Sequence, residues 1–434
     1  MLKYDKILVG VERICMIKNS LKTLQERYGN IERENSNNLA KFMKRTRIDQ
    51  KRTLEDVSRG VCSPSYLSKI ENCQVDVDEY YFQSLFEKLD LKYESLKVER
   101  ETSFISKIIK YYLLERYDLL EENLKRMVNV NSYCDTELEL IILLNNIIRE
   151  NYDEAEILIT KLEEVRKTLT KEELYLLSFL ITLYLYSTNQ YVLAAKQIEI
   201  LIQHPSENEY YNMAVCDLGM DIYFVLGKES LFYQLYQKLK QFNKQELYNN
   251  RILIHNMQNL VFQARNGNFN LLEELETIKM ALSKTDINEE YIILNEALIY
   301  YYLEDYRKVL EITESCKTNV QIMVVEASAI NRLNDISKSI KFADKIKSID
   351  FNVKNTVYSE FLEYMREKFE QYSYVKLLSY LKNVILPKSK ENYVFWLYEQ
   401  ENLEYFTLCF ELGKYKEVVR FLIKTEDLKK IKKI

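Results

Sequence analysis

One short stretch of this chain carries polar side chains in a pattern that suits contact with a nucleic acid. Five polar residues alternate with apolar ones in this run, so that in a helix they would lie on the face opposite the apolar side chains: Ser63, Ser65, Tyr66, Ser68 and Lys69. Serine hydroxyls can bond to base edges or phosphates, and a tyrosine hydroxyl and an ammonium group can reach phosphates. If the run is helical, its N-terminus also favours an anion. The pattern therefore predicts a helix that presents its polar, N-terminal side to a DNA groove.

The residues around this run contain the signals that start and stop short helices. Thr53 is the expected N-cap of a helix from Leu54 to Arg59, and Gly60 marks the turn that follows. Ser63 is the expected N-cap of the next helix, with Pro64 at the first helical position, where its missing N–H costs nothing. Two short helices joined by a tight turn are therefore predicted.

Apolar spacing shows how these two helices would pack. A small core between them is expected from Val57, Val61, Leu67 and Ile70, and Ser58 is small where they approach. An earlier helix should carry Leu39, Met43 and Thr46 on one face, and two further helices are expected over 78–89 and 92–98. Residues 38–99 are therefore predicted to form one small helical domain. Residues 1–37 read as a helical extension (5–28) and a polar linker, without an assigned role.

Charge is divided unevenly along the chain. The 434 residues carry a net charge of −5, but residues 1–75 hold 15 Lys and Arg against 9 Asp and Glu, whereas the remainder holds 46 against 57. A basic head on an acidic body indicates that the head meets a polyanion and the body does not.

From about residue 100 onward, apolar helices alternate with short turns, and only 7 glycines and 3 prolines are present, which favours an all-α chain over sheets. Turns at nine places lie mostly 35 to 40 residues apart. The signature at most of them is an aromatic residue three positions before a small or aliphatic one: Tyr117/Leu120, Tyr152/Ala155, Tyr191/Ala194, Phe269/Leu272, Tyr306/Val309, Tyr374/Leu377 and Tyr415/Val418. Gly227 and Asn334 mark the other two. Residues 100–434 are therefore predicted to form about nine helix pairs in a right-handed TPR-like α-solenoid.

The stretch from Thr53 to Asn72, TLEDVSRGVCSPSYLSKIEN, resembles the helix-turn-helix of Xre-type DNA-binding proteins. In particular it is similar to that of the peptide-sensing RRNPP regulators, which include the Rgg, NprR, PlcR and PrgX relatives, and the helix pairs behind it complete the same architecture over residues 38–434. Two features depart from the family: Cys73 stands where a glycine is usual, and the N-terminal extension is additional.

The resemblance implies a sequence-specific DNA-binding transcriptional regulator that acts as a homodimer on an operator in double-stranded DNA. By their positions in the family pattern, Arg47, Lys51, Arg52 and Thr53 should contact the backbone beside the groove. Two alternatives stay open: a helix-turn-helix regulator without a peptide ligand, and a TPR scaffold that binds proteins.

The resemblance also implies that the repeat domain binds a short signalling oligopeptide of the quorum-sensing type. Asparagine amides suit this role because each offers a donor and an acceptor to a peptide main chain, and arginine suits a carboxylate. The candidates on the first helices of the pairs are Asn212, Arg251, Asn256, Asn259, Arg265, Asn295 and Asn331. The 35 tyrosines are interpreted mainly as packing between helices.

Other classes of protein find little support in the sequence. Neither His204 nor His255 lies in a metal-binding or catalytic motif, and phosphate-binding glycine loops are absent, so we expect no enzyme, no cofactor and no metal site. Seven scattered cysteines without a C-x-x-C pair, no apolar run long enough for a membrane and no signal peptide predict a cytoplasmic protein.

Overall fold

The computed structural model describes residues 38–72, 74–75, 77–91, 104–129, 136–166, 169, 171–242, 249–283, 289–316, 319–348 and 356–424. Within these ranges every regular element is helical, which confirms the all-α prediction. The chain divides into two compact units, residues 1–219 with 238–243, and residues 220–237 with 244–434. The predicted extension over 1–37 and the helix expected over 92–98 lie outside the described residues.

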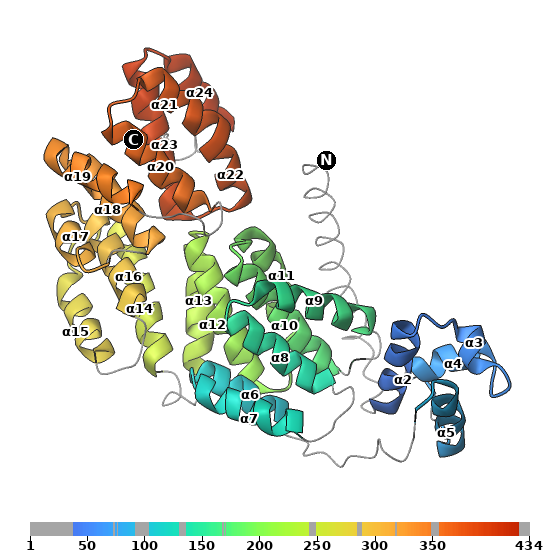
Figure 1. The fold of residues 1–434 in the computed structure, drawn as a ribbon. Helices are drawn as coiled ribbons and strands as arrows, with labels where there is room; N and C mark the ends of the chain where they lie inside the picture. Colours follow the sequence, from blue (N-terminus) through green and yellow to red (C-terminus); the bar gives the residue numbers. More distant parts are fainter. Residues whose placement is uncertain are drawn as a thin grey trace. The chain divides into compact units, whose positions relative to one another are not determined.

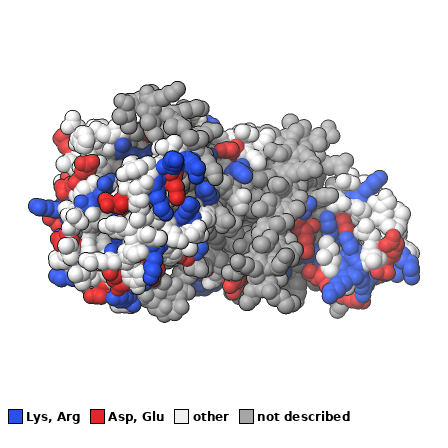
Figure 2. All heavy atoms as spheres, turned by 90° about the horizontal axis from the view of Figure 1, so that it is seen from above, with Lys and Arg blue, Asp and Glu red and all other residues white. Residues whose placement is uncertain are grey.

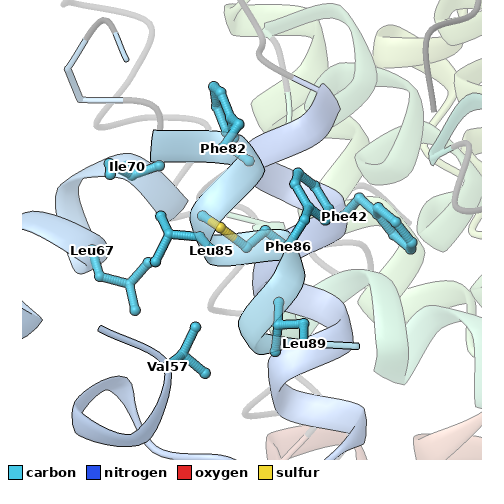
Figure 3. Packing of buried hydrophobic residues seen from close by; sticks show 10 residues of the cluster. Phe42, Val57, Leu67, Ile70, Phe82, Leu85, Phe86 and Leu89 are labelled. Atoms are coloured by element: carbon cyan, nitrogen blue, oxygen red, sulfur yellow. The ribbon is translucent and has the colours of Figure 1, made fainter. Parts of the chain in front are cut away.

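The first described helices form a small four-helix head within the first unit. They are α2 (Asn38–Asp49), α3 (Leu54–Ser58), α4 (Pro64–Glu71) and α5 (Glu79–Lys88). Their buried side chains point toward one another in one cluster (Figure 3), which consists of Ala40, Phe42, Met43, Val57, Leu67, Ile70, Phe82, Leu85, Phe86 and Leu89. Val61, expected in this core, is only partly buried at its edge. The core holds α3 and α4 at a fixed angle to α2.

The predicted helix starts in the head are confirmed. Thr53 and Asp56 form a capping box, because the Thr53 side chain accepts from the Asp56 N–H and the Asp56 carboxylate accepts from the Thr53 N–H. The Ser63 hydroxyl oxygen accepts from the Tyr66 N–H at 3.1 Å, and Pro64 follows it. Gly60 takes a φ of +79°, a conformation that glycine adopts without strain. These local bonds set where α4 begins.

From Phe104 to Lys424 the described helices follow one another in pairs (Figure 1). The pairs of the first unit are α6 (Phe104–Leu113) with α7 (Tyr117–Asn129), α8 (Thr136–Ile148) with α9 (Tyr152–Glu164), and α10 (Lys171–Ser187) with α11 (Tyr191–Gln203). Helices α12 (Glu209–Val225) and α13 (Glu229–Gln241) begin in one unit and pass into the other. Each of the nine turns expected from the sequence separates two described helices.

The second unit continues the pairing in two layers. Layer A consists of α14 (Asn249–Arg265), α16 (Glu289–Tyr302), α18 (Val320–Leu333) and α20 (Val357–Phe369), each packed on the next. Layer B consists of α15 (Leu272–Leu282), α17 (Tyr306–Thr313) and α19 (Ile336–Lys347). Helix α15 packs on α14, α17 packs on α16 and α18, and α19 packs on α18 and α20.

The chain then passes through α21 (Tyr374–Tyr380), the π-helix η4 (Leu381–Ile385) and α22 (Leu386–Glu391) to α23 (Phe395–Glu411) and α24 (Tyr415–Lys424). Helix α23 packs beside α21, η4, α22 and α24.

Burial explains why some of these helices lack an amphipathic pattern. Nearly the whole of α10 is buried, from Glu173 to Leu185, because neighbouring helices cover it on several sides. Tyrosines contribute to such packing as expected: Tyr175 and Tyr211 meet edge to face with ring centroids 5.6 Å apart. None of the helices described is both long and apolar enough to cross a membrane.

Candidate functional site

Helix α4 presents polar side chains on the side opposite the head core. Leu67 and Ile70 are fully buried, whereas Ser63, Ser65 and Lys69 are exposed. The exposed group includes the N-cap residue, so the first-turn N–H groups of α4 lie at the same end as the serine hydroxyls. This end combines hydroxyl groups with the positive end of the helix dipole, and Lys69 adds an exposed cation in the last turn of the same helix. Such groups suit phosphate oxygens and base edges.

Two of the predicted contact residues on α4 are less available than expected. Tyr66 is half-buried against the head core, and the centroid of its ring lies 5.6 Å from that of Tyr81. Much of the Tyr66 ring therefore packs inside the head. Ser68 is half-buried, and its hydroxyl oxygen accepts from the Asn72 side-chain amide at 3.4 Å, as its carbonyl does at 2.8 Å. Asn72 in turn accepts from the Lys44 ammonium at 3.0 Å, which ties α4 to α2.

Arg47 lies in an internal ion pair, contrary to the expectation that it reaches the DNA backbone. Its guanidinium donates to both carboxylate oxygens of Glu71, at 2.6 and 2.8 Å, and to the Arg52 carbonyl at 3.0 Å. The exposed fraction is 13% for the Arg47 side chain and 2% for that of Glu71. Because all these bonds stay within the chain, Arg47 fixes α2 against the end of α4 instead of facing a ligand.

The next two predicted contacts are also engaged with their own chain. Arg52 forms an ion pair with Asp90 at 2.9 Å and donates to the Lys88 carbonyl. The Thr53 hydroxyl oxygen accepts from the Asp56 N–H in the capping box. Lys51, in the turn after α2, is exposed with a φ of +55°. Lys51 therefore remains as an exposed cation just before α3.

The sequence interpretation missed one exposed cation near α4. Arg59 lies directly after α3, in the turn that leads to Ser63, and is exposed. The sequence did contain a signal for it: Arg59 directly precedes Gly60, and a cation in this turn lies close to the N-terminus of the following helix. Lys51, Arg59 and Lys69 thus give the α3–α4 side of the head three exposed cations.

Acidic residues of the head lie on α3 as well as near α5. Glu55 and Asp56 are exposed in the first turn of α3. Asp78, Glu87 and Asp90 lie on α5 or at its ends. Lys and Arg side chains form a visible group on the head, the lobe at the right of Figure 2, with acidic side chains beside them. The exposed cations Lys51, Arg59 and Lys69 thus lie in a part of the head that also exposes acidic side chains.

The seven residues predicted to bind a peptide do not converge on one place. Both ends of the Asn212 amide bond to the Ser206 backbone, at 2.8 and 2.9 Å. The buried Asn295 donates to the Tyr291 carbonyl at 2.8 Å. The Asn256 and Asn259 carbonyls accept from Tyr236 and Tyr233 respectively, so both amides face α13.

Arg251 belongs to a buried polar network between α12, α14 and α16. It donates to Asp221 at 2.7 Å, and the other carboxylate oxygen of Asp221 accepts from Gln258 at 2.8 Å. Gln258 also bonds to the Tyr291 hydroxyl at 2.6 Å and to His255 at 2.7 Å. Burial, with Asp221 nearby, holds the pKa of Tyr291 well above its usual value. The network satisfies its own groups and links three helices.

Arg265 and Asn331 are brought toward one element, helix α23. Arg265 pairs with Glu399, and the Asn331 amide donates to Glu404 at 2.9 Å. These two predicted residues therefore do share a surface, and a segment of the same chain lies on it.

Comparison of the chain with protein-family models, with curated proteins and with solved structures found no match. Among the residues described, no three His, Cys, Asp or Glu side chains come together as a metal site. The candidate functional surfaces are thus the exposed end of α4 and the face of layer A that contacts α23.

Proposed function

We propose that this protein is a sequence-specific DNA-binding transcriptional regulator. In this proposal α3 and α4 act as a helix-turn-helix, with α4 as the recognition helix, and the helix pairs form a TPR-like array that dimerises the chain and binds a short peptide. The observation that carries it is the exposed polar side of α4, with Ser63 and Ser65 at its N-terminal end and Lys69 in its last turn, on a rigid support. A helix that enters the major groove with its N-terminal residues toward the bases needs this arrangement.

The support beneath α4 strengthens the proposal. The Arg47–Glu71 pair and the Lys44–Asn72 bond fix both the register and the tilt of α4 against α2. Side chains that read base edges must be held within a fraction of an ångström by groups that do not themselves contact DNA. Lys51 and Arg59 lie on either side of α3, where they can neutralise phosphates on the flanking backbone.

The direct test is selection of bound duplexes from a pool of random DNA by the purified full-length protein. A regulator should enrich one motif over successive rounds, and a homodimer should enrich a motif with two-fold symmetry whose half-sites lie about 10 base pairs apart or a multiple of this. Enrichment of no motif, with retention that only follows the salt concentration, would exclude sequence-specific binding and favour a protein-binding scaffold.

A further inference from the structure

Helix α23 has a composition unlike that of a surface helix. Its sequence, FWLYEQENLEYFTLCFE, contains aromatic residues and four glutamates but no lysine or arginine. Trp396, Glu401, Glu404, Tyr405 and Cys409 are all buried. Acidic side chains avoid burial unless other groups pair with them, so the contacts of these glutamates show what α23 lies against.

The first turn of α23 inserts an aromatic ring between earlier helices. The ring centroid of Phe395 lies 5.7 Å from that of Phe224 in the last turn of α12 and 5.7 Å from that of Phe262 in α14. The Arg265 guanidinium carbon lies 5.0 Å from the centroid of the Phe395 ring. Gly227 completes this contact, because a Cβ atom there would lie 2.7 Å from the Phe395 Cβ.

Glu399, one turn further along α23, receives bonds from two helices of layer A. Arg265 of α14 reaches Glu399 Oε1 with Nε at 2.8 Å and Nη2 at 2.6 Å. The Tyr302 hydroxyl of α16 donates to Oε2 at 2.6 Å. Burial, with Glu399 beside it, holds the pKa of Tyr302 well above its usual value, so this hydroxyl stays a donor.

Glu404 repeats the pattern on the next two helices of layer A. It accepts from the Asn331 amide of α18 at 2.9 Å. From α20 it accepts the Tyr364 hydroxyl at 2.7 Å and the Lys368 ammonium at 2.6 Å. Trp396 adds an apolar contact on α20, where it stacks on Tyr358 with ring centroids 5.8 Å apart. Residues of α23 thus contact all four helices of layer A.

Helix α23 contacts more of the preceding helices than the stacking of neighbouring helix pairs requires. In an array of helix pairs, each pair contacts mainly the pairs directly before and after it. The last pair therefore needs contacts with α20, α21 and α22, but α23 also bonds to α14 and α16, whose Arg265 and Tyr302 precede Glu399 by 134 and 97 positions.

We propose that α23 is an internal ligand of layer A, and that the external partner of this surface is a peptide of the same chemistry. The surface offers the rings of Phe224 and Phe262, which contact Phe395, then Arg265 with Tyr302, then Lys368 with Tyr364 and Asn331. It therefore fits an acidic, aromatic peptide with two carboxylates about five residues apart, as in Glu399 and Glu404. The peptide would bind by displacing α23. The identity of this partner rests on the proposed peptide-binding function.

Two glycines provide a matched pair of variants for the test. Gly227 and Gly267 both have positive φ, +64° and +82°, so alanine strains the backbone at either position. Only at Gly227 does the added Cβ collide with Phe395, whereas at Gly267 it meets nothing within 4 Å. Gly227→Ala should therefore loosen α23, and Gly267→Ala reports the effect of strain alone.

Trp396 is the only tryptophan of the chain, and it reports directly on whether α23 is in place. We expect its emission to shift to the red in full-length Gly227→Ala and its quenching by acrylamide to rise, with little change in Gly267→Ala. Equal behaviour of the two variants would show that α23 does not depend on the Phe395 contact.

The second measurement adds the ligand from outside. A labelled peptide with the sequence of residues 393–411, with phenylalanine in place of the tryptophan, is titrated into each full-length protein. Because α23 competes for the same surface, the peptide should bind Gly227→Ala about ten-fold or more tightly than the native chain or Gly267→Ala. The same peptide with Glu399→Gln and Glu404→Gln should bind none of the three with comparable strength.

The peptide titration tests the internal-ligand proposal alone. Equal affinity of the native-sequence peptide and the peptide with both glutamines would overturn this proposal, as would no binding to Gly227→Ala while its circular dichroism remains helical. DNA selection is scored separately: a chain that enriches a motif but fails the peptide test keeps its proposed role as a DNA-binding regulator. A chain that passes the peptide test without enriching DNA loses that role and keeps the peptide-binding surface.

Discussion

At the residue scale, the Arg47–Glu71 pair shows how a buried charge can serve a DNA-binding head without contacting DNA. The two side chains are 24 positions apart and meet only when α2 and α4 pack, with Glu71 almost fully buried. Glu71 lies within the motif from Thr53 to Asn72 and Arg47 lies before it, but nothing local in the sequence distinguishes a cation that faces solvent from one that is paired inside. The family pattern predicts that Arg47 contacts the DNA backbone, whereas in the structure its guanidinium donates to Glu71 and supports α4.

This pair gives a prediction about stability. Glu71→Gln should leave the Arg47 charge buried without a full partner and destabilise the head by about 3–5 kcal/mol, whereas Asp90→Asn, which breaks the exposed pair with Arg52, should cost about 0–1 kcal/mol. Hydrogen exchange of α2 and α4 in the full-length chain measures the difference. Equal exchange in the two variants would contradict a supporting role for the buried pair.

Glu401 gives a second prediction at this scale. Burial raises the pKa of this carboxyl to about 8, although the Ser389 hydroxyl donates to it at 2.7 Å. Its other oxygen has no hydrogen-bond partner among the described residues. The folded state therefore holds the proton more tightly than the unfolded state, in which the pKa is near 4.5. The contribution of protonated Glu401 to the free energy of unfolding is therefore present at low pH, and it is lost as the pH rises from about 4.5 to about 8.

The native chain should accordingly lose stability around α23 between about pH 5 and about pH 8, and Glu401→Gln should remove much of this loss. The measurement is the urea midpoint followed by Trp396 emission at both pH values. If the native chain and Glu401→Gln change in parallel, another group controls the pH dependence.

At the element scale, helix starts were the most predictable feature. Ser63 with Pro64, and Thr53 with Asp56, act within four residues of each other, so their types and order reveal the bonds they form. The turns between the two helices of each pair were predictable for the same local reason. The contacts of α23 were not, because Glu399 and Arg265 lie far apart in the chain and are joined only by the packing of layer A.

Ser63 lets the capping role and the DNA role be separated. Ser63→Ala should remove the bond from the Tyr66 N–H and destabilise α4 by about 1 kcal/mol, whereas Ser63→Asp should keep a cap of similar strength. At the proposed interface, however, the aspartate would repel phosphate. We expect Ser63→Asp to retain native hydrogen exchange in α4 and to lose DNA binding. Native affinity in that variant would place α4 outside the interface.

At the scale of the whole molecule, pairing of helices from Phe104 to Lys424 followed from the repeated turns, but the division into two units did not. The aromatic and turn signature is the same on both sides of the division, so no local pattern marks it. The right-handed TPR-like form of the array and its role in dimerisation stay predictions.

Dimerisation can be tested on the intact protein. The chain has a mass of 52.1 kDa. Sedimentation equilibrium at micromolar concentration should give the proposed regulator a mass of about twice this value. The selected DNA motif should then be two-fold symmetric. A monomer that selects a single half-site would contradict the proposed role of the array in dimerisation.

The measurement that tests the central claim most directly is fluorescence anisotropy of a selected duplex at about 0.15 M salt, where non-specific phosphate attraction is weak. Native protein, Lys69→Ala and Lys88→Ala are compared; Lys69 lies on α4, and Lys88 is an exposed lysine of the same head on α5. We predict saturable binding that Lys69→Ala weakens about ten-fold and Lys88→Ala leaves unchanged. Equal affinity of all three for the selected duplex and for a shuffled one would contradict recognition of DNA through α4.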